Sequence, residues 1–143
     1  MKKLVLLFSI LLLASCSTED DAGDVINNEF EQVELILPQD VWKVSNLYTD
    51  NADRTDDFQN FTFSFREDGT VEGQTDLFTE VGTWAYKSST ENGEQLILQF
   101  NSTTLFDEIS NDWKIVSLSI SKIELINEGN SSEDTRLLAF SKL

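Results

Sequence analysis

The feature that most constrains the fold is a run of aromatic residues at every second position. Phe61, Phe63 and Phe65 alternate with polar residues, so an extended segment here has one aromatic face and one polar face. Asp68-Gly69 follows, and Asp-Gly flanked by alternating segments is among the strongest short signals for a hairpin. The segment is therefore predicted to open a series of antiparallel β-strands.

Further segments with strand character extend from Trp42 to the end of the chain, separated by polar turns such as Asn92-Gly93. For the segment 81–86 the sequence does not decide which face points into the core, because Val81, Thr83 and Ala85 lie on one face and Trp84 on the other. Together these patterns predict eight strands of mostly six or seven residues, over residues 42–48, 60–66, 70–75, 81–86, 96–100, 113–119, 122–127 and 136–142.

Eight consecutive strands with short connections indicate an antiparallel meander, and closing a meander removes its two exposed edges. We therefore predict an all-β fold, an eight-stranded up-and-down barrel. The interior of such a barrel is just wide enough for side chains or for one small ligand.

A short helix is predicted to precede the barrel. Asn28 is placed to cap its start and Pro38 to end it. A helix of this length is not stable alone, so it is expected to cover one end of the barrel. Its apolar residues recur at a spacing of three or four, at Ile26, Phe30, Val33 and Leu37.

The first residues have the character of an export signal. Lys2 and Lys3 precede an apolar run over residues 4–13, which is too short to span a bilayer but typical of a signal peptide. The sequence Leu13-Ala14-Ser15-Cys16 resembles the lipobox of bacterial lipoproteins, in which cleavage before the cysteine exposes a thiol that takes a diacylglycerol. This resemblance implies a signal peptide over residues 1–15 and a membrane anchor, with palmitate-type acyl chains, on Cys16.

Residues 16–28 are expected to form an acidic tether behind that anchor. The acids at 19–21 resemble the surface-export signal of Bacteroidetes-type lipoproteins. The resemblance implies an outer-membrane protein on the cell surface, with the periplasmic face as the alternative.

The order of motifs over residues 29–143 is similar to that of the lipocalin-like lipoproteins of the same bacteria. These are small barrels, mostly of unknown function. Asp40 stands where true lipocalins carry the glycine of a Gly-x-Trp motif, so a conventional lipocalin ligand is not implied. The matching motifs are Trp42-Lys43-Val44, the segment 61–71, Gly82-Thr83-Trp84, Leu96-Ile97-Leu98, Trp113-Lys114-Ile115 and the segment 138–142.

Composition excludes several classes of function. A net charge of -16 rules out attraction to nucleic acid or to anionic lipid headgroups. The chain has no histidine and no cysteine besides Cys16, which excludes Ser-His-Asp and Cys-His nucleophiles and leaves few ligands for zinc or copper. We therefore expect no enzymatic activity and no cofactor.

Calcium is the one metal that the residues leave open. Weak candidate ligands lie in one loop, at Asp50, Asp53, Asp56 and Asp57. Their order does not match an EF-hand and Arg54 lies among them, so the alternative is a plain polar loop without a metal.

Two functional hypotheses remain, and from the sequence we favour the first, with the second as the alternative. In the first, the barrel is a binding module that holds a small apolar or amphipathic ligand; candidate lining residues are Trp42, Phe63, Trp84, Phe100, Trp113 and Phe140. Those rings alternatively fill the core. In the second hypothesis the barrel is packed, and its outer surface contacts another envelope protein or a polysaccharide. The oligomeric state is not indicated.

Overall fold

The computed structural model describes residues 32–101, 105–131 and 134–143. The predicted signal peptide, Cys16 and the acidic tether lie outside these residues. Within them the chain forms nine strands, and the bounds are β1 (Val41–Thr49), β2 (Ala52–Asp53), β3 (Thr62–Phe65), β4 (Thr70–Gln74), β5 (Thr79–Ser89), β6 (Gly93–Phe100), β7 (Asn111–Leu118), β8 (Lys122–Asn127) and β9 (Arg136–Lys142).

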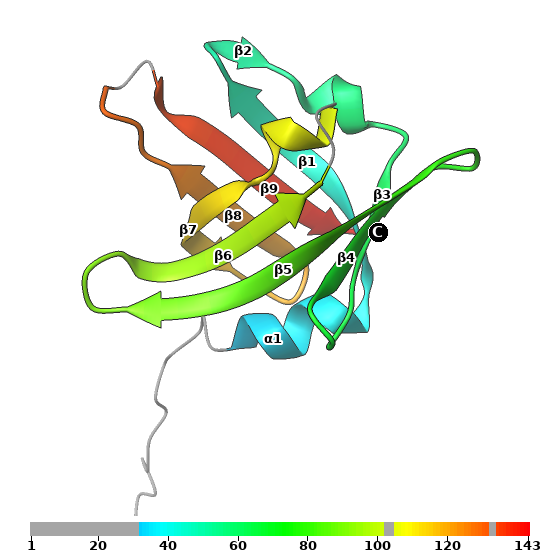
Figure 1. The fold of residues 1–143 in the computed structure, drawn as a ribbon, viewed down its shortest axis with the longest axis horizontal. Coiled ribbons are helices and arrows are strands. Elements are labelled where there is room, and N and C mark those ends of the chain that lie inside the picture. The colour runs from blue at the N-terminus through cyan, green and yellow to red at the C-terminus, as the bar shows by residue number, and fades with distance from the viewer. Residues whose placement is uncertain (1–31, 102–104, 132–133) are drawn as a thin grey trace, which may run out of the picture.

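The sheet closes into an eight-stranded antiparallel barrel, as the sequence predicts. From β3 onward each strand pairs with the next along the chain; β3 and β9 both pair with β1, so the ring closes (Figure 1). Trp42 lies opposite Lys142 at the closing pair, where Lys142 also forms an ion pair of 2.7 Å with Asp40. The additional strand β2 has two residues and pairs only with the end of β1.

A short helical segment precedes the barrel, but its end differs from the prediction. Helix α1 (Val33–Ile36) is followed directly by a 3₁₀ turn, η2 (Leu37–Gln39), which contains Pro38. Proline fits here because it lies at the start of the turn, where its missing N–H costs no hydrogen bond. Winding stops only at Asp40, whose φ of −140° and ψ of 172° are extended. The predicted start at Asn28 lies outside the described residues.

The two predicted glycine turns are present. Gly69 has φ +85° and Gly93 has φ +71°, a region in which glycine is not strained. At the first turn, Oδ1 of Asp68 accepts a hydrogen bond of 2.9 Å from the backbone N–H of Thr70. The Asp-Gly signal therefore reflects both the glycine backbone and the aspartate side chain.

Alternation on the strands directs one face of each into the core. Trp84 points inward and is only 6% exposed, whereas Val81, Thr83 and Ala85 are exposed on the outer face. On β1 the alternation is interrupted by a bulge at Ser45, which lets Val44 and Leu47 both face inward. Inward-facing and outward-facing side chains thus alternate along each strand, and one extra residue in a bulge shifts this alternation.

Strand direction gives the barrel two distinct ends. The helix end carries α1, η2 and the connections at 66–69, 90–92 and 119–121 (Figure 1). The opposite distal end carries the described residues 50–61, 75–78, 101, 105–110, 128–131 and 134–135. Two 3₁₀ turns lie at the distal end, η3 (Thr55–Phe58) and η4 (Leu105–Glu108). Neither was expected from the sequence. No helix among the described residues is long and apolar enough to cross a membrane.

Candidate functional site

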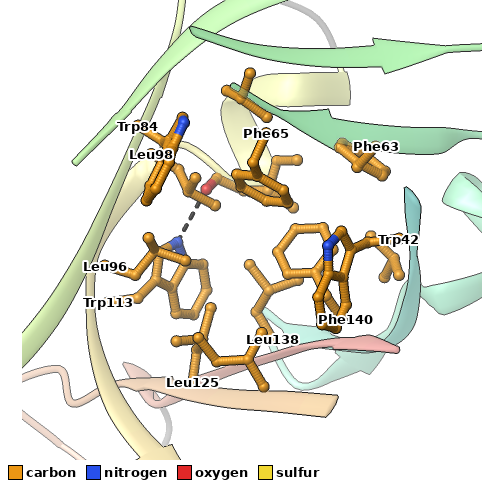
Figure 2. Close-up of a cluster of buried hydrophobic side chains, with 14 of the residues drawn as sticks. Trp42, Phe63, Phe65, Trp84, Leu96, Leu98, Trp113, Leu125, Leu138 and Phe140 are labelled. Carbon is orange, nitrogen blue, oxygen red and sulfur yellow. Dashed lines mark hydrogen bonds between the residues drawn. The ribbon is translucent and has the colours of Figure 1, made fainter. Parts of the chain in front are cut away.

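The structure places the six candidate ligand-lining side chains inside the barrel, where they contact other core side chains. Each is at most 6% exposed, and all belong to one continuous cluster of buried residues. Figure 2 shows five of them, all except Phe100, converging from opposite walls on the same interior, together with the leucines of β6, β8 and β9. Phe63 and Phe65 both meet the ring of Phe140 edge-on, at centroid distances of 5.2 and 5.6 Å.

The three indole N–H groups are already bonded to backbone carbonyls of the segments that close the barrel. Nε1 of Trp42 donates to the carbonyl of Leu37 in η2 at 3.0 Å, and Nε1 of Trp113 donates to that of Ile109, just after η4, at 2.9 Å. Nε1 of Trp84 donates to the carbonyl of Arg66 at 2.8 Å. Two of these bonds connect the wall to a closing segment at each end, so they hold the barrel shut.

The helix end is closed by the apolar side of the leading helical segment. Val33 and Leu37 are fully buried, and they lie four residues apart on the same side of the turn. Here the prediction that the helix covers one end of the barrel agrees with the structure.

The distal end is closed by a plug of aromatic rings centred on Phe106 of η4. Phe106 is 1% exposed. Its ring contacts five other phenylalanine rings at centroid distances of 4.8 to 6.4 Å, those of Phe58, Phe61, Phe63, Phe78 and Phe100. Gly73 of β4 makes room for this ring, because a Cβ there would lie 2.3 Å from Cε1 of Phe106.

The sequence interpretation did not select Phe58, Phe106 or Ile109, although all three are buried at this end. Phe58 and Phe106 stand in acidic segments, Thr55-Asp56-Asp57-Phe58 and Leu105-Phe106-Asp107-Glu108, with no periodic pattern around them. The available signal was a large apolar residue alone in an acidic loop, which indicates a residue drawn into a core.

Several open depressions formed by described residues lie on the outside of the barrel. Trp84 and Phe100 each line the wall of one, but neither depression leads into a cavity among the rings. A third, of about 320 Å³, lies on the outer wall beside Val116 and Leu137. In the part of the chain that the structure describes, the interior is therefore a packed core.

The four candidate calcium ligands do not converge. Asp57 pairs with Arg54, Asp50 lies 3.8 Å from Arg136, and Asp53 accepts a hydrogen bond of 2.9 Å from the backbone N–H of Thr55. Among the described residues no group of three or more acidic side chains is close enough to hold a metal ion.

Local hydrogen bonds perturb three carboxylates on the surface. The side chain and then the backbone of Thr55 hold the pKa of Asp53 below its ordinary value. The backbone N–H and then the hydroxyl of Thr70 lower the pKa of Asp68 in the same way. The ammonium group of Lys122, followed by the hydroxyl of Ser117, lowers the pKa of Glu124. All three shifts favour the charged carboxylate, which suits a turn or a surface ion pair rather than an acid catalyst.

Comparison with known proteins adds a relationship of fold. No family model matches the sequence. No curated protein matches it significantly. Among solved structures the chain is similar to a DUF4847 family protein from Bacteroides vulgatus ATCC 8482, with a TM-score of 0.53 and 20% sequence identity over 76% of this chain and 96% of that one. The chain is thus a β-barrel related in fold to a family of unknown function.

Proposed function

We propose that this protein is a non-catalytic envelope lipoprotein, anchored through lipid on Cys16, whose packed barrel contacts another envelope protein or a polysaccharide through its outer surface. Its location in this proposal is the outer membrane, on the cell surface, with the periplasmic face as the alternative. Of the two hypotheses that the sequence left open, this one requires no cavity inside the barrel.

The observation that carries the proposal is the filled interior. The six candidate ligand-lining rings pack against one another and against the plugs, and the three indole N–H groups are bonded to backbone. Binding sites for small molecules are concave and expose a few unpaired polar groups to the ligand. A ligand inside this barrel would first have to displace one of the two plugs.

The composition supports a role without catalysis. With no histidine and no second cysteine, acid–base chemistry falls to carboxylates. The carboxylates with shifted pKa values lie at turns and surface ion pairs, and their shifts keep them charged. A binding role needs none of these groups to exchange a proton.

The position of the leading helical segment is consistent with an anchor at Cys16. The described chain begins at the helix end. A tether of sixteen residues between Cys16 and the described chain has an upper limit of about 58 Å, at roughly 3.6 Å per residue. The distal end is then the part of the barrel farthest from the attachment point of the tether.

An anilinonaphthalene sulfonate titration of the purified lipoprotein tests the packed interior. We expect no saturable fluorescence at micromolar dye, because no apolar cavity is open to it. Phe106→Ala and the milder Phe106→Leu are the controls, since each removes part of the distal plug and should increase dye binding. Saturable one-to-one binding by the unmodified chain, with quenching of tryptophan fluorescence, would contradict the proposal.

Metabolic labelling with palmitate tests the anchor. We expect label on the unmodified chain and none on Cys16→Ala, and we expect protease added to intact cells to degrade the labelled protein. Ser15→Ala is a matched control that retains the thiol. Label that persists in Cys16→Ala would refute the anchor, and protection from protease would place the protein on the periplasmic face.

A further inference from the structure

The distal end presents an exposed leucine beside a half-exposed phenylalanine of the aromatic plug. Leu77, at the tip of the hairpin between β4 and β5, is 97% exposed, and the neighbouring Phe78 is 47% exposed. Turn positions of this kind are usually occupied by Gly, Asn, Asp or Ser. A leucine and a phenylalanine are therefore not explained by the turn itself.

The tip is held in a defined position. The backbone N–H of Thr75 donates to the carbonyl of Phe78 at 2.8 Å, and the backbone N–H of Leu77 donates to the hydroxyl of Thr75 at 3.3 Å. Below it, the ring of Phe78 meets the rings of Phe61 and Phe106 at 6.5 and 6.4 Å. The tip that carries the exposed leucine is thus joined to the aromatic plug through Phe78.

A hollow of about 440 Å³ lies against this tip. It is lined by Asn60, Thr62, Gln74, Thr75, Asp76 and Leu77. Its walls combine amides and hydroxyls with one apolar side chain, so it suits a side chain or backbone that forms hydrogen bonds beside an apolar contact.

The distal end as a whole carries a strongly negative charge. Among the described residues, the distal segments together with Arg136 contain nine carboxylates and two arginines. Both arginines are already paired, Arg54 with Asp57 and Glu108, and Arg136 with Asp50. Asp76, which precedes Leu77, and Asp107, which follows Phe106 in η4, have no ion pair within the described part of the chain.

From this combination we infer that the distal end binds a basic segment of a partner protein, one that places an apolar side chain against Leu77 and Phe78 and lysines or arginines against the surrounding carboxylates. The inference rests on the proposed function and specifies its contact site. Charge complementarity selects the partner, because like charge repels nucleic acid and anionic lipid. Proteins contain flexible segments that combine positive charge with an apolar side chain, whereas most polysaccharides do not. The apolar patch beside Val116 and Leu137 lacks this bias, because Lys122 and Glu124 line it together.

Binding of synthetic peptides to the full lipoprotein, held on phosphatidylcholine vesicles, tests the site. The probe is a short lysine-rich peptide that carries two leucines, compared with peptides in which serine replaces leucine or glutamate replaces lysine. We expect saturable binding of the first peptide only. Equal binding of the lysine–serine peptide would overturn the inference, because charge alone would then explain the attraction.

Matched variants locate the contact. Leu77→Asn should weaken binding of the lysine–leucine peptide about tenfold, as expected for losing the burial of one leucine side chain. Ile120→Asn is the control, because Ile120 is 78% exposed in a turn at the helix end. Both residues are highly exposed, so neither substitution should change the free energy of unfolding. Urea unfolding of both variants checks this. Equal effects of the two variants, or no effect of Leu77→Asn, would overturn the site.

The charged part of the site has its own pair of variants. The double variant Asp76→Asn with Asp107→Asn should bind the lysine–leucine peptide more weakly, and its affinity should depend less on salt. The double variant Glu67→Gln with Glu91→Gln makes the same change of charge at the helix end. It should leave the affinity for the peptide and its salt dependence unchanged. An identical loss in the two double variants would show that net charge acts without a site, and would overturn the inference.

A photo-crosslinking residue at position 77 or 120 in cells separates failure of the site from failure of the proposed function. Crosslinks to a protein from 77 and not from 120, lost when Asp76→Asn and Asp107→Asn are added, are the expected result. Protein crosslinks from 120 alone would retain the surface-contact function and overturn the distal site. Failure of the proposed function itself has a different readout, saturable dye binding in the interior.

Discussion

Gly73 of β4 is where the distal plug meets the barrel wall, and its substitution measures how tightly that plug is packed. A Cβ at position 73 would lie 2.3 and 2.8 Å from two carbons of the Phe106 ring and 3.1 Å from Cε1 of Phe63. Overpacking of a core costs about 1–3 kcal/mol. We expect Gly73→Ala to lie near the upper end, about 3 kcal/mol, because Phe106 cannot move without displacing the five rings around it.

A double-mutant cycle distinguishes this clash from a backbone effect. Phe106→Ala alone should cost about 3–5 kcal/mol through the cavity it leaves. In the double variant the methyl group added at position 73 enters that space, so the combined loss should be smaller than the sum by about 1–3 kcal/mol.

Urea unfolding followed by tryptophan fluorescence measures these differences, with the slope checked for constancy. Gly93→Ala is the control: its Cβ meets nothing within 4 Å, so only the positive φ of +71° is strained. It should cost about 1–2 kcal/mol and add independently to Phe106→Ala. A Gly73→Ala variant within about 0.5 kcal/mol of the parent, or additivity in the cycle, would refute the packing argument.

Three further outcomes follow from groups described above. The hydroxyl of Thr49 is buried without a hydrogen-bond partner in the described structure, so Thr49→Val should raise the free energy of unfolding by about 1 kcal/mol in the same assay; a loss would show that the hydroxyl is satisfied. Trp113→Phe leaves the buried carbonyl of Ile109 unpaired and should cost about 1–3 kcal/mol, whereas a neutral result would mean that this bond does not hold the plug. Asp68, whose pKa is lowered by folding, stabilises the native state above the ordinary value of 3.8, and this contribution is lost as the pH falls through the lower native value. Thermal melting should therefore show a steeper loss below about pH 4 for the parent than for Asp68→Asn, and parallel curves would contradict it.

The strands could be predicted from the sequence because each carries its own signal. Alternation at Phe63 and Phe65 and the turns at Gly69 and Gly93 are local features, and they indicate that a strand is present. They do not fix its bounds: Phe61 lies before β3, and the segment predicted as 81–86 extends over Thr79–Ser89. The orientation of Trp84 could not be decided locally, because aliphatic and aromatic residues occupy both faces of β5. Its neighbours across the barrel decide it: the Phe65 ring meets Trp84 edge-on at 5.6 Å.

The state of the interior could not be predicted, because it depends on two turns with almost no periodic pattern. η3 and η4 each bury one phenylalanine from an acidic segment, and these two rings meet edge-on at 5.7 Å although they lie far apart in the sequence. Neither segment has the length or repeat by which a helix is recognised. From the sequence alone, the aromatic residues on the strands are therefore compatible with a ligand pocket or with a packed core. The positions of η3 and η4 decide between the two.

The pairing of β1 with β9 has a consequence for how the protein is made. The closing contacts join residues such as Trp42 and Lys142, which are almost the whole barrel apart in sequence, and pairing over such a separation forms more slowly than the local hairpins. Until β9 has been synthesised, β1 keeps an unsatisfied edge and no stable intermediate ring exists. For a chain that must cross a membrane before it folds, as we propose here, this late closure keeps the polypeptide threadable through the translocation channel.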